Sequence, residues 1–431
     1  MDKTIDLLVI GAGPAGLMAA KTASECGLNV VLIEKLKNIN DLRRACSAQF
    51  ILDDGYENEF IKLQNNKIIF TKNNFFVNYD GKLVEVKNKY YTSPSNHKIH
   101  FSLPNEKPFA LKFDKKRLLY NLYKECISSG VDVRMATLAR GGSDNGVYVS
   151  VDLKDTITNT LYTLNAKKLI IAEGANAHLT GLFGFNTNRT HFATALVAKY
   201  ILKGISEIEP NSWNLFYGKA FFSNAPVIIG PSLYGDNVFE LTISASASMR
   251  PDLIYKKLIN DDSPLKKKFE NIKLIDKKGC AVKAFSSLKT PYNNNVIVIG
   301  DSAAFVEVEV QGALMCGYHA AYAVKDELEN KNGFEKYTNW WKNSFEFNSD
   351  DYLLVSQGYA LVPTYTDDEL DYLFASIEGK TLEGTYSQYK TPKLIWDAIL
   401  LNKDKIEKEK PHIYEKIKKM NTLTLTDTFK N

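Results

Sequence analysis

The order of apolar and polar positions predicts a strand, a helix and a second strand at the start of the chain. Residues 5–10 form a short, largely apolar run, which is typical of a strand that is buried on both faces. Residues 14–26 are mostly small and apolar, as in a closely packed helix, and residues 28–33 form a second apolar run. This order predicts a parallel βαβ unit.

Further along, the pattern changes between alternating and helical spacing. Residues 66–112 alternate apolar and polar positions between turn-like segments, which indicates antiparallel sheet. A helix is expected from its N-cap Asp114 to Gly130, followed by strands that include a buried run at 168–172. Residues 190–290 alternate again, with proline and asparagine turns, and predict a second stretch of antiparallel sheet.

Three glycines separate the first strand from its helix. Gly11, Gly13 and Gly16 have the spacing that permits a tight turn, close approach of the backbone to a pyrophosphate, and close helix packing. The helix N-terminus also presents unpaired N–H groups to phosphates. Glu34 ends the second strand, where a carboxylate accepts hydrogen bonds from a ribose 2′-hydroxyl, so FAD or NAD is expected rather than NADP. The expected cofactor contacts here are Gly11, Gly13, Pro14, Ala15, Gly16, Glu34 and Lys35.

A second motif selects FAD. Residues 296–299 predict a buried strand that leads into Gly300–Asp301 and then into a helix of small residues from about Gln311. An aspartate at such a strand end is an acceptor for the hydroxyls of the ribityl chain. The helix would direct N–H groups at the flavin ring, and its small residues would let the backbone approach a planar group. The expected contacts here are Gly300, Asp301, Gly312, Ala313 and Leu314.

We therefore predict an α/β fold with a Rossmann-like FAD-binding domain, an interleaved antiparallel-sheet substrate domain and a helical C-terminal extension. The FAD-binding domain is expected to be discontinuous, over residues 1–65, 113–185 and 290–332. The substrate domain would comprise residues 66–112 and 186–289, and the extension residues 333–431.

Over nearly its whole length, the chain resembles the FAD-dependent oxidoreductases of the p-hydroxybenzoate hydroxylase fold, and among them most the geranylgeranyl reductase family. The resemblance rests on the two motifs, the helix after Asp114, the order of the sheets, and the stretch RRACSAQF at 43–50. It implies that Arg117 lies near the flavin diphosphate and ribityl chain, and that Cys46 lies beside the flavin ring. Arg44, Ala45 and Gly174 are further cofactor contacts that we expect.

The chain departs from the family pattern near the reactive edge of the flavin. Related hydroxylases carry Asp-Gly where this chain has Glu173–Gly174, and Val308 replaces the proline of the second motif. Residues 311–313 replace a glycine cluster, and two acids, Glu307 and Glu309, occur in the same segment. FAD binding is still expected, but these changes leave open a redox-neutral or structural use of the cofactor.

Three residues are candidates for proton transfer. Cys46 is a candidate redox or proton-donating thiol, and Arg43 and Arg44 beside it would favour its thiolate. The alternative interpretation is a small buried cysteine. Glu307 and Glu309 are candidate general acids or bases, because desolvation near a flavin raises the pKa of a carboxyl. Their alternative is an exposed strand or loop face.

Composition limits the remaining possibilities. A net charge of +4 over 431 residues provides no strong field for nucleic acid. No apolar stretch reaches the length of a membrane span, and the first strand begins too early to leave room for a signal peptide. The five cysteines lie far apart, without a zinc or iron–sulfur pattern. We expect a cytoplasmic protein, with contact at the membrane periphery as an option.

The favoured function is reduction of a C=C bond in an apolar, isoprenoid-like substrate, as the family resemblance implies. Reduced flavin would supply the hydride and a nearby acid such as Cys46 the proton, while NAD(P)H, ferredoxin or a similar donor would reduce the flavin. One alternative is a monooxygenase of an aromatic or polyketide-like compound. Another is electron transfer to a quinone, which the lack of iron–sulfur cysteines disfavours. The third is a flavoprotein with redox-neutral or structural FAD.

Overall fold

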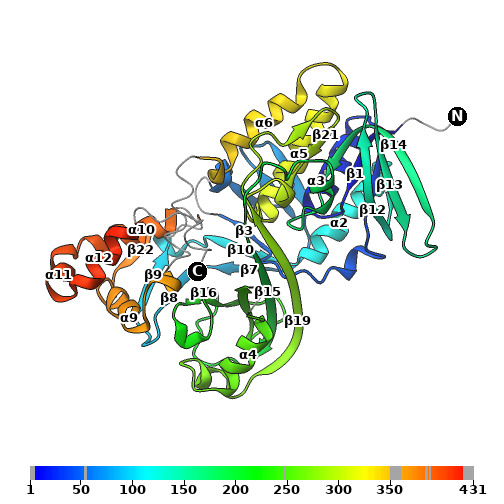
Figure 1. Ribbon diagram of the computed structural model, residues 1–431. Helices are drawn as coiled ribbons and strands as arrows, with labels where there is room; N and C mark the ends of the chain where they lie inside the picture. Colours follow the sequence, from blue (N-terminus) through cyan, green and yellow to red (C-terminus); the bar gives the residue numbers. More distant parts are fainter. Residues whose placement is uncertain are drawn as a thin grey trace.

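The computed structural model describes residues 5–52, 56–246, 249–349, 361–383, 387 and 390–420. Two eight-stranded sheets dominate these residues, and they lie in different parts of the molecule (Figure 1). The C-terminal helices α11 (Lys403–Glu409) and α12 (Pro411–Met420) lie at the end opposite β1 (Ile5–Ile10).

The first sheet contains the predicted βαβ unit. Its main path runs through β11 (Asp132–Arg134), β2 (Val30–Ile33), β1, β14 (Leu161–Ile171), β13 (Val149–Asp155) and β12 (Thr137–Asp144). The pairs β2–β1, β1–β14 and β14–β21 (Val296–Val298) are parallel, and β20 (Tyr292–Asn293) pairs with β21. This parallel part is buried on both faces, as its apolar runs predict.

Two helices cover this parallel part of the sheet. The helix α1 (Pro14–Glu25) follows β1 and packs against α5 (Glu309–Leu328), which follows β21. At their contact, Gly317 lies so close to α1 that a Cβ there would come within 2.3 Å of the Ala15 carbonyl oxygen. The small residues of both helices therefore serve helix packing, and they hold the two cofactor motifs side by side.

One part of this sheet differs from the prediction. The buried run expected at 168–172 is the second half of a longer strand, β14, and β12 was not predicted. The first half of β14 pairs antiparallel with β13, so its side chains alternate between exposed and less exposed positions. Its second half is buried between β1 and β21, which explains why the two halves have different patterns.

The second sheet is antiparallel over most of its width. Its order is β19 (Lys273–Phe285), β15 (His191–Lys203), β18 (Val238–Ser246), β17 (Val227–Pro231), β16 (Ser212–Phe216), β8 (Asn88–Thr92), β9 (Lys98–Ser102) and β22 (Thr381–Glu383). One face packs against α4 (Pro251–Asn260), where Leu241 and Ile243 meet Ile254 and Leu258. Because side chains alternate along a strand, Thr242 and Ser244 point to the opposite face.

The helix α4 corrects the prediction that residues 190–290 form only sheet. Pro251 occupies the first helical position, and Ile254 and Leu258 are spaced for one helical face. These signals are short, and the alternating strands on either side of them dominated the sequence pattern.

Smaller elements connect the two sheets. Two of them are three-stranded sheets. One consists of β3 (Gln49–Ile51), β10 (Ala110–Phe113) and β7 (Leu83–Val86). The other consists of β4 (Ile61–Gln64), β5 (Lys67–Phe70) and β6 (Phe75–Asn78). The predicted helix α2 (Lys115–Ser128) follows β10 directly. Its N-cap Asp114 accepts hydrogen bonds from the N–H groups of Lys116 and Arg117 at 2.9 and 3.3 Å, as expected.

The C-terminal region is mainly helical, as predicted. Besides α11 and α12 it contains α6 (Gly333–Ser344), α8 (Leu361–Thr364), α9 (Asp367–Ala375) and α10 (Lys390–Leu400). One strand departs from that prediction, because β22 pairs parallel with β9 and attaches this region to the second sheet. Among the described residues, no helix is both long and apolar enough to cross a membrane. The exact domain boundaries stay a prediction.

Candidate functional site

A cavity of about 1130 Å³ extends from the first sheet to the second. It begins at the glycine turn, Gly11–Ala15, and passes the segment 43–47. It then follows the exposed face of the second sheet as far as α10. Its volume is at the upper end for a small-molecule site, so it has room for a cofactor and a second molecule.

The glycine turn has the geometry of a phosphate site. Gly11 has φ +102°, and a Cβ there would lie 2.5 Å from the Ala172 carbonyl oxygen. A Cβ on Gly16 would lie 1.8 Å from the Gly11 oxygen, so α1 packs directly on the turn. Gly13 has open space around it and provides no side-chain cap for α1. The first N–H groups of α1 are thus available to an anion, and the residues fit the diphosphate of FAD.

Glu34 supports this turn and lines the same cavity. Its Oε2 accepts a hydrogen bond from the Ala12 N–H at 2.8 Å, and its Oε1 accepts one from the Leu36 N–H at 2.9 Å. A carboxylate has about four acceptor positions, so the two bonds leave capacity for ribose hydroxyls. The position agrees with the predicted role, and Lys35 lines the cavity beside it.

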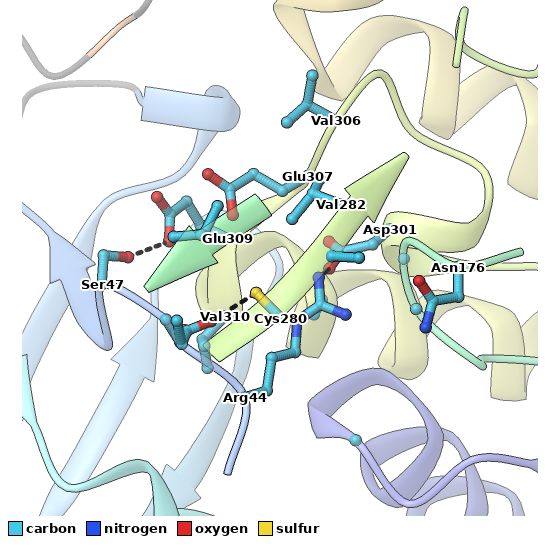
Figure 2. A pocket seen from close by; sticks show the side chains of 18 of the residues that line it. Arg44, Ser47, Asn176, Cys280, Val282, Asp301, Val306, Glu307, Glu309 and Val310 are labelled. Carbon is cyan, nitrogen blue, oxygen red and sulfur yellow. Dashed lines mark hydrogen bonds and ion pairs between the residues drawn. The ribbon is translucent and has the colours of Figure 1, made fainter. Parts of the chain in front are cut away.

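Arg44 and Asp301 face each other in the cavity wall (Figure 2). Arg44 Nη2 lies 3.5 Å from Asp301 Oδ2. Asp301 follows β21, and its Oδ1 accepts a hydrogen bond from the Val308 N–H at 3.0 Å. Asp301 is therefore an acceptor at the strand end and fixes the segment that leads into α5, and its contact with a ribityl chain stays a prediction.

Residues 173 and 174 lie beside this pair. A Cβ on Gly174, which has φ +80°, would lie 3.4 Å from Arg44 Nη1. The carboxylate of Glu173 accepts hydrogen bonds from the N–H groups of Leu179 and Thr180, at 3.0 and 2.7 Å. Glu173, which stands in place of the hydroxylases' aspartate, thus caps the short helix α3 (His178–Leu182).

Two acids line the cavity immediately before and at the start of α5. Glu307 and Glu309 both reach it, and Ser47 Oγ donates a hydrogen bond to Glu309 Oε2 at 2.8 Å (Figure 2). Burial raises the pKa of Glu309 to about 7. The neighbouring charge of Glu309 and burial raise the pKa of Glu307 well above its ordinary value. Neither side chain lies on a freely exposed face, and the pair can hold a proton at neutral pH.

The backbone is strained at the same place. Val306 has φ +59° and Glu309 has φ +54°, both in the left-handed region that non-glycine residues rarely adopt. For the β-branched Val306 this conformation is especially unfavourable. Such strain persists where the surrounding structure enforces it, and here it occurs in the segment that bears the two carboxylates.

Cys46 lines the cavity next to a cation. Lys115, the first residue of α2, donates a hydrogen bond from Nζ to Cys46 Sγ at 3.5 Å. The sequence suggested Arg43 and Arg44 as the cations that favour a thiolate. Lys115 makes the direct contact and Arg43 is exposed, while Arg44 pairs with Asp301 and also interacts electrostatically with Cys46.

Four of the predicted cofactor residues do not line the cavity. Arg117 donates from Nε to Asp80 Oδ1 at 2.8 Å, and its side chain is 41% exposed. Gly16 and Gly312 serve packing, and a Cβ on Gly312 would come within 2.7 Å of the Phe345 ring. Leu314 is fully buried in the core. The remaining predicted contacts do line the cavity: Gly11, Gly13, Pro14, Ala15, Glu34, Lys35, Arg44, Ala45, Cys46, Gly174, Gly300, Asp301 and Ala313.

The second sheet supplies an apolar wall. A row of paired residues runs across five strands and lines the cavity: Lys199, Thr242, Ile228, Leu215 and Tyr91. The helix α10 covers this region with Ile395 and Trp396, and Leu361 of α8 also lines it. Sequence analysis gave these C-terminal residues no role, because nothing local shows that α10 reaches the sheet.

Sequence analysis also missed three buried charges behind residues 46 and 47. Each of these charges interrupts a largely apolar strand segment: Lys112 in ALKF, Lys199 in ALVAKYIL and Glu240 in VFELTI. A lone charge in such a run was the available signal, since a charge that is fully buried needs a partner. The Nζ atoms of Lys112 and Lys199 each lie 2.5 Å from Glu240 Oε2.

Comparison with known proteins agrees with this geometry. Residues 4–199 match the family described as FAD binding domain. The digeranylgeranylglycerophospholipid reductase of Methanosarcina acetivorans is 24% identical over 425 residues, which cover 94% of this chain and 98% of that protein. The protein of the same name from Methanocaldococcus jannaschii is 21% identical over 397 residues, or 89% and 93% of the two chains.

Solved structures share the fold. A geranylgeranyl bacteriochlorophyll reductase-like protein from Thermoplasma acidophilum has a TM-score of 0.73 at 17% identity, over 97% of this chain and 99% of that one. The p-nitrophenol 4-monooxygenase PnpA of Pseudomonas putida has a TM-score of 0.65 at 13% identity, with the same coverage. The predicted fold class and cofactor are confirmed, and the chain is similar over most of its length to FAD-dependent reductases of the geranylgeranyl type.

Proposed function

We propose that this enzyme reduces C=C bonds in the apolar chain of an isoprenoid lipid. The observation that carries the proposal is one continuous cavity, in which the residues that fit FAD lead into an apolar wall. Cys46 and Glu309 line it as well. The relatives named as reductases of a digeranylgeranyl lipid support the same substrate class.

Two groups of residues would hold the cofactor. Gly11, Gly13 and the N-terminus of α1 would bind the diphosphate, and Glu34 would accept from ribose hydroxyls. Asp301 would accept from the ribityl chain. Bound by these residues, reduced FAD would supply the hydride for reduction of the double bond.

The second carbon then needs a proton, and this chain offers two acids for it. Cys46 would transfer its thiol proton, and Lys115 at 3.5 Å would stabilise the thiolate that is left. Glu309, whose pKa burial raises to about 7, carries a proton for part of the time at neutral pH and can restore the donor. The hydride and the proton together saturate the bond.

The apolar wall determines what can enter. Its side chains include Val197, Leu215 and Ile228 from the second sheet and Ile395 and Trp396 from α10. They offer an isoprenoid chain apolar contact, and they exclude water from the reacting carbons. A lipid substrate also requires access to a membrane surface, so peripheral membrane contact is part of this proposal.

Filling the apolar wall tests the substrate class. The Ile228→Trp variant should raise KM for a long polyprenyl substrate about tenfold or more, while it keeps bound FAD, because the larger ring occupies space that the chain needs. Steady-state kinetics with short and long prenyl substrates measures the effect. Leu274→Trp, at an exposed position of β19, is the matched control. An unchanged KM for the long substrate in the Ile228 variant would place the substrate elsewhere.

Removing the Glu34 carboxylate tests the cofactor site. The Glu34→Ala variant should bind FAD more weakly by about 1–3 kcal/mol, because ribose hydroxyls and the Ala12 N–H lose their acceptor. Titration of FAD into apoprotein, followed by flavin fluorescence, measures the affinity. Glu25→Ala, at the exposed end of α1, is the control. Equal affinities in the two variants would place Glu34 outside the site.

A further inference from the structure

We infer that Lys112, Lys199 and Glu240 form a buried clamp that positions Cys46 and Ser47 in the cavity wall. Lys199 Nζ donates to the carbonyl oxygen of Cys46, and Lys112 Nζ donates to that of Ser47 at 3.0 Å. Glu240 Oε2 lies 2.5 Å from each ammonium group and holds the two lysines together. The meaning of this positioning for catalysis rests on the proposed function of Cys46.

The clamped segment has no hydrogen-bond ladder of its own and depends on contacts with its surroundings. Residues 43–48 belong to no helix or strand. Two further carbonyl oxygens of the segment accept hydrogen bonds from β19 of the second sheet. The Arg43 oxygen accepts from the Gly279 N–H at 3.2 Å, and the Ala45 oxygen accepts from Cys280 Sγ at 3.7 Å. The segment is thus held against the sheet through its own carbonyl oxygens, and the two lysines supply charged donors, which make the stronger hydrogen bonds.

The burial of the cluster suggests a role beyond stability. Lys112 is 0% exposed, Lys199 4% and Glu240 7%. Burial lowers the pKa of Lys112 to about 8. Burial also opposes the ionised form of Glu240, but the two lysines outweigh it and hold its pKa below the ordinary value. Buried ion clusters add little stability relative to apolar side chains of the same volume. The hydrogen bonds of this cluster to the Cys46 and Ser47 carbonyl oxygens point instead to a role in positioning.

The clamp reaches both proton-bearing groups of the site. Lys199 holds the backbone of Cys46, whose thiol meets Lys115. Lys112 holds the backbone of Ser47, whose hydroxyl donates to Glu309. The three clamp residues are positioning residues, because they act through the segment that bears Cys46 and Ser47.

The reactivity of the Cys46 thiol tests the clamp without any substrate. Alkylation of the FAD-loaded protein by iodoacetamide is followed at each cysteine by mass spectrometry between pH 6 and 10. Lys199→Met should slow alkylation of Cys46 about tenfold at pH 7, because a nearby cation is lost and the backbone of Cys46 is no longer held in place. Lys199→Arg, which keeps a charged donor, should restore most of the reactivity.

Controls separate this result from a general loss of structure. Cys26, at the C-cap of α1, should react equally in all variants. Lys203→Met removes the same charge at an exposed position of β15 and should leave Cys46 unchanged. Wild-type reactivity of Cys46 in a folded Lys199→Met protein would overturn the inference. Lys112→Met serves as a second variant in case Lys199→Met does not fold. If neither methionine variant folds, the cluster serves stability and the inference is wrong. Normal turnover by Cys46→Ala, in contrast, would remove the proposed function of Cys46 and leave the clamp standing.

Discussion

The Cys46→Ala variant is expected to keep its fold and its FAD but to reduce its substrate about 10²–10⁴-fold more slowly, the usual effect of losing a general acid. Addition of a hydride leaves a carbon that must receive a proton, and the thiol of Cys46 is exposed to the cavity where the apolar wall begins. Rapid mixing of anaerobically reduced protein with substrate, followed by flavin absorbance, gives the rate.

Two further variants sharpen this experiment. Cys46→Ser should keep part of the activity, because a hydroxyl can relay a proton from water. Cys26→Ala changes a cysteine at the C-cap of α1 and should react at the wild-type rate. A normal rate in Cys46→Ala would mean that Cys46 only packs in the wall, and Glu309 would become the acid to test next.

The second large effect is expected at Glu309. Burial raises the pKa of its carboxyl to about 7, so the fraction that holds a proton falls as the pH rises through that value. The activity of the wild-type protein should therefore decline across pH 6–8. Glu309→Gln should slow substrate reduction about 10²-fold and remove this decline, since an amide does not titrate. Rates of substrate reduction measured from pH 5.5 to 9 for both proteins give the loss of rate and the change in pH dependence.

The same carboxyl should make stability depend on pH. Its folded-state pKa is raised above the ordinary 4.5, so its contribution is complete below pH 4.5 and is lost as the pH rises through about 7. The full loss of this contribution corresponds to about 3 kcal/mol in the free energy of unfolding. Glu309→Gln should remove this loss in urea unfolding measured at pH 5 and 8, and Glu329→Gln, an exposed acid, should not. Equal pH dependence in wild-type protein and Glu309→Gln would mean that Glu309 is ionised throughout.

The local motifs were the part of the site that the sequence could reveal. Gly11 and Gly13 form the turn, Glu34 supports it from the end of β2, and their spacing alone indicates a dinucleotide. Arg117 was given a role near the flavin from the family resemblance, but its side chain does not line the cavity. Lys115, two residues earlier, reaches the cavity, while Arg117 points to Asp80, because residues two apart on a helix face different directions.

The remaining parts depend on contacts between distant segments. Lys112 and Glu240 are 128 residues apart, and Ser47 and Glu309 are 262 residues apart. Their partnerships follow from the way β10, β18 and the start of α5 meet around residues 43–48, which no local pattern encodes. The covering of the apolar wall by α10 depends in the same way on the attachment of β22 to β9.

The most direct test of the central claim is a single turnover of the reduced protein with a geranylgeranyl lipid. Protein with fully reduced FAD is mixed with the lipid without oxygen, and the product is analysed by mass spectrometry. We predict that the flavin is reoxidised while the lipid gains two hydrogens for each double bond lost, and that a parallel reaction under labelled oxygen leaves no label in the product. Flavin that stays reduced in the presence of the lipid, or labelled oxygen in the product, would contradict the account.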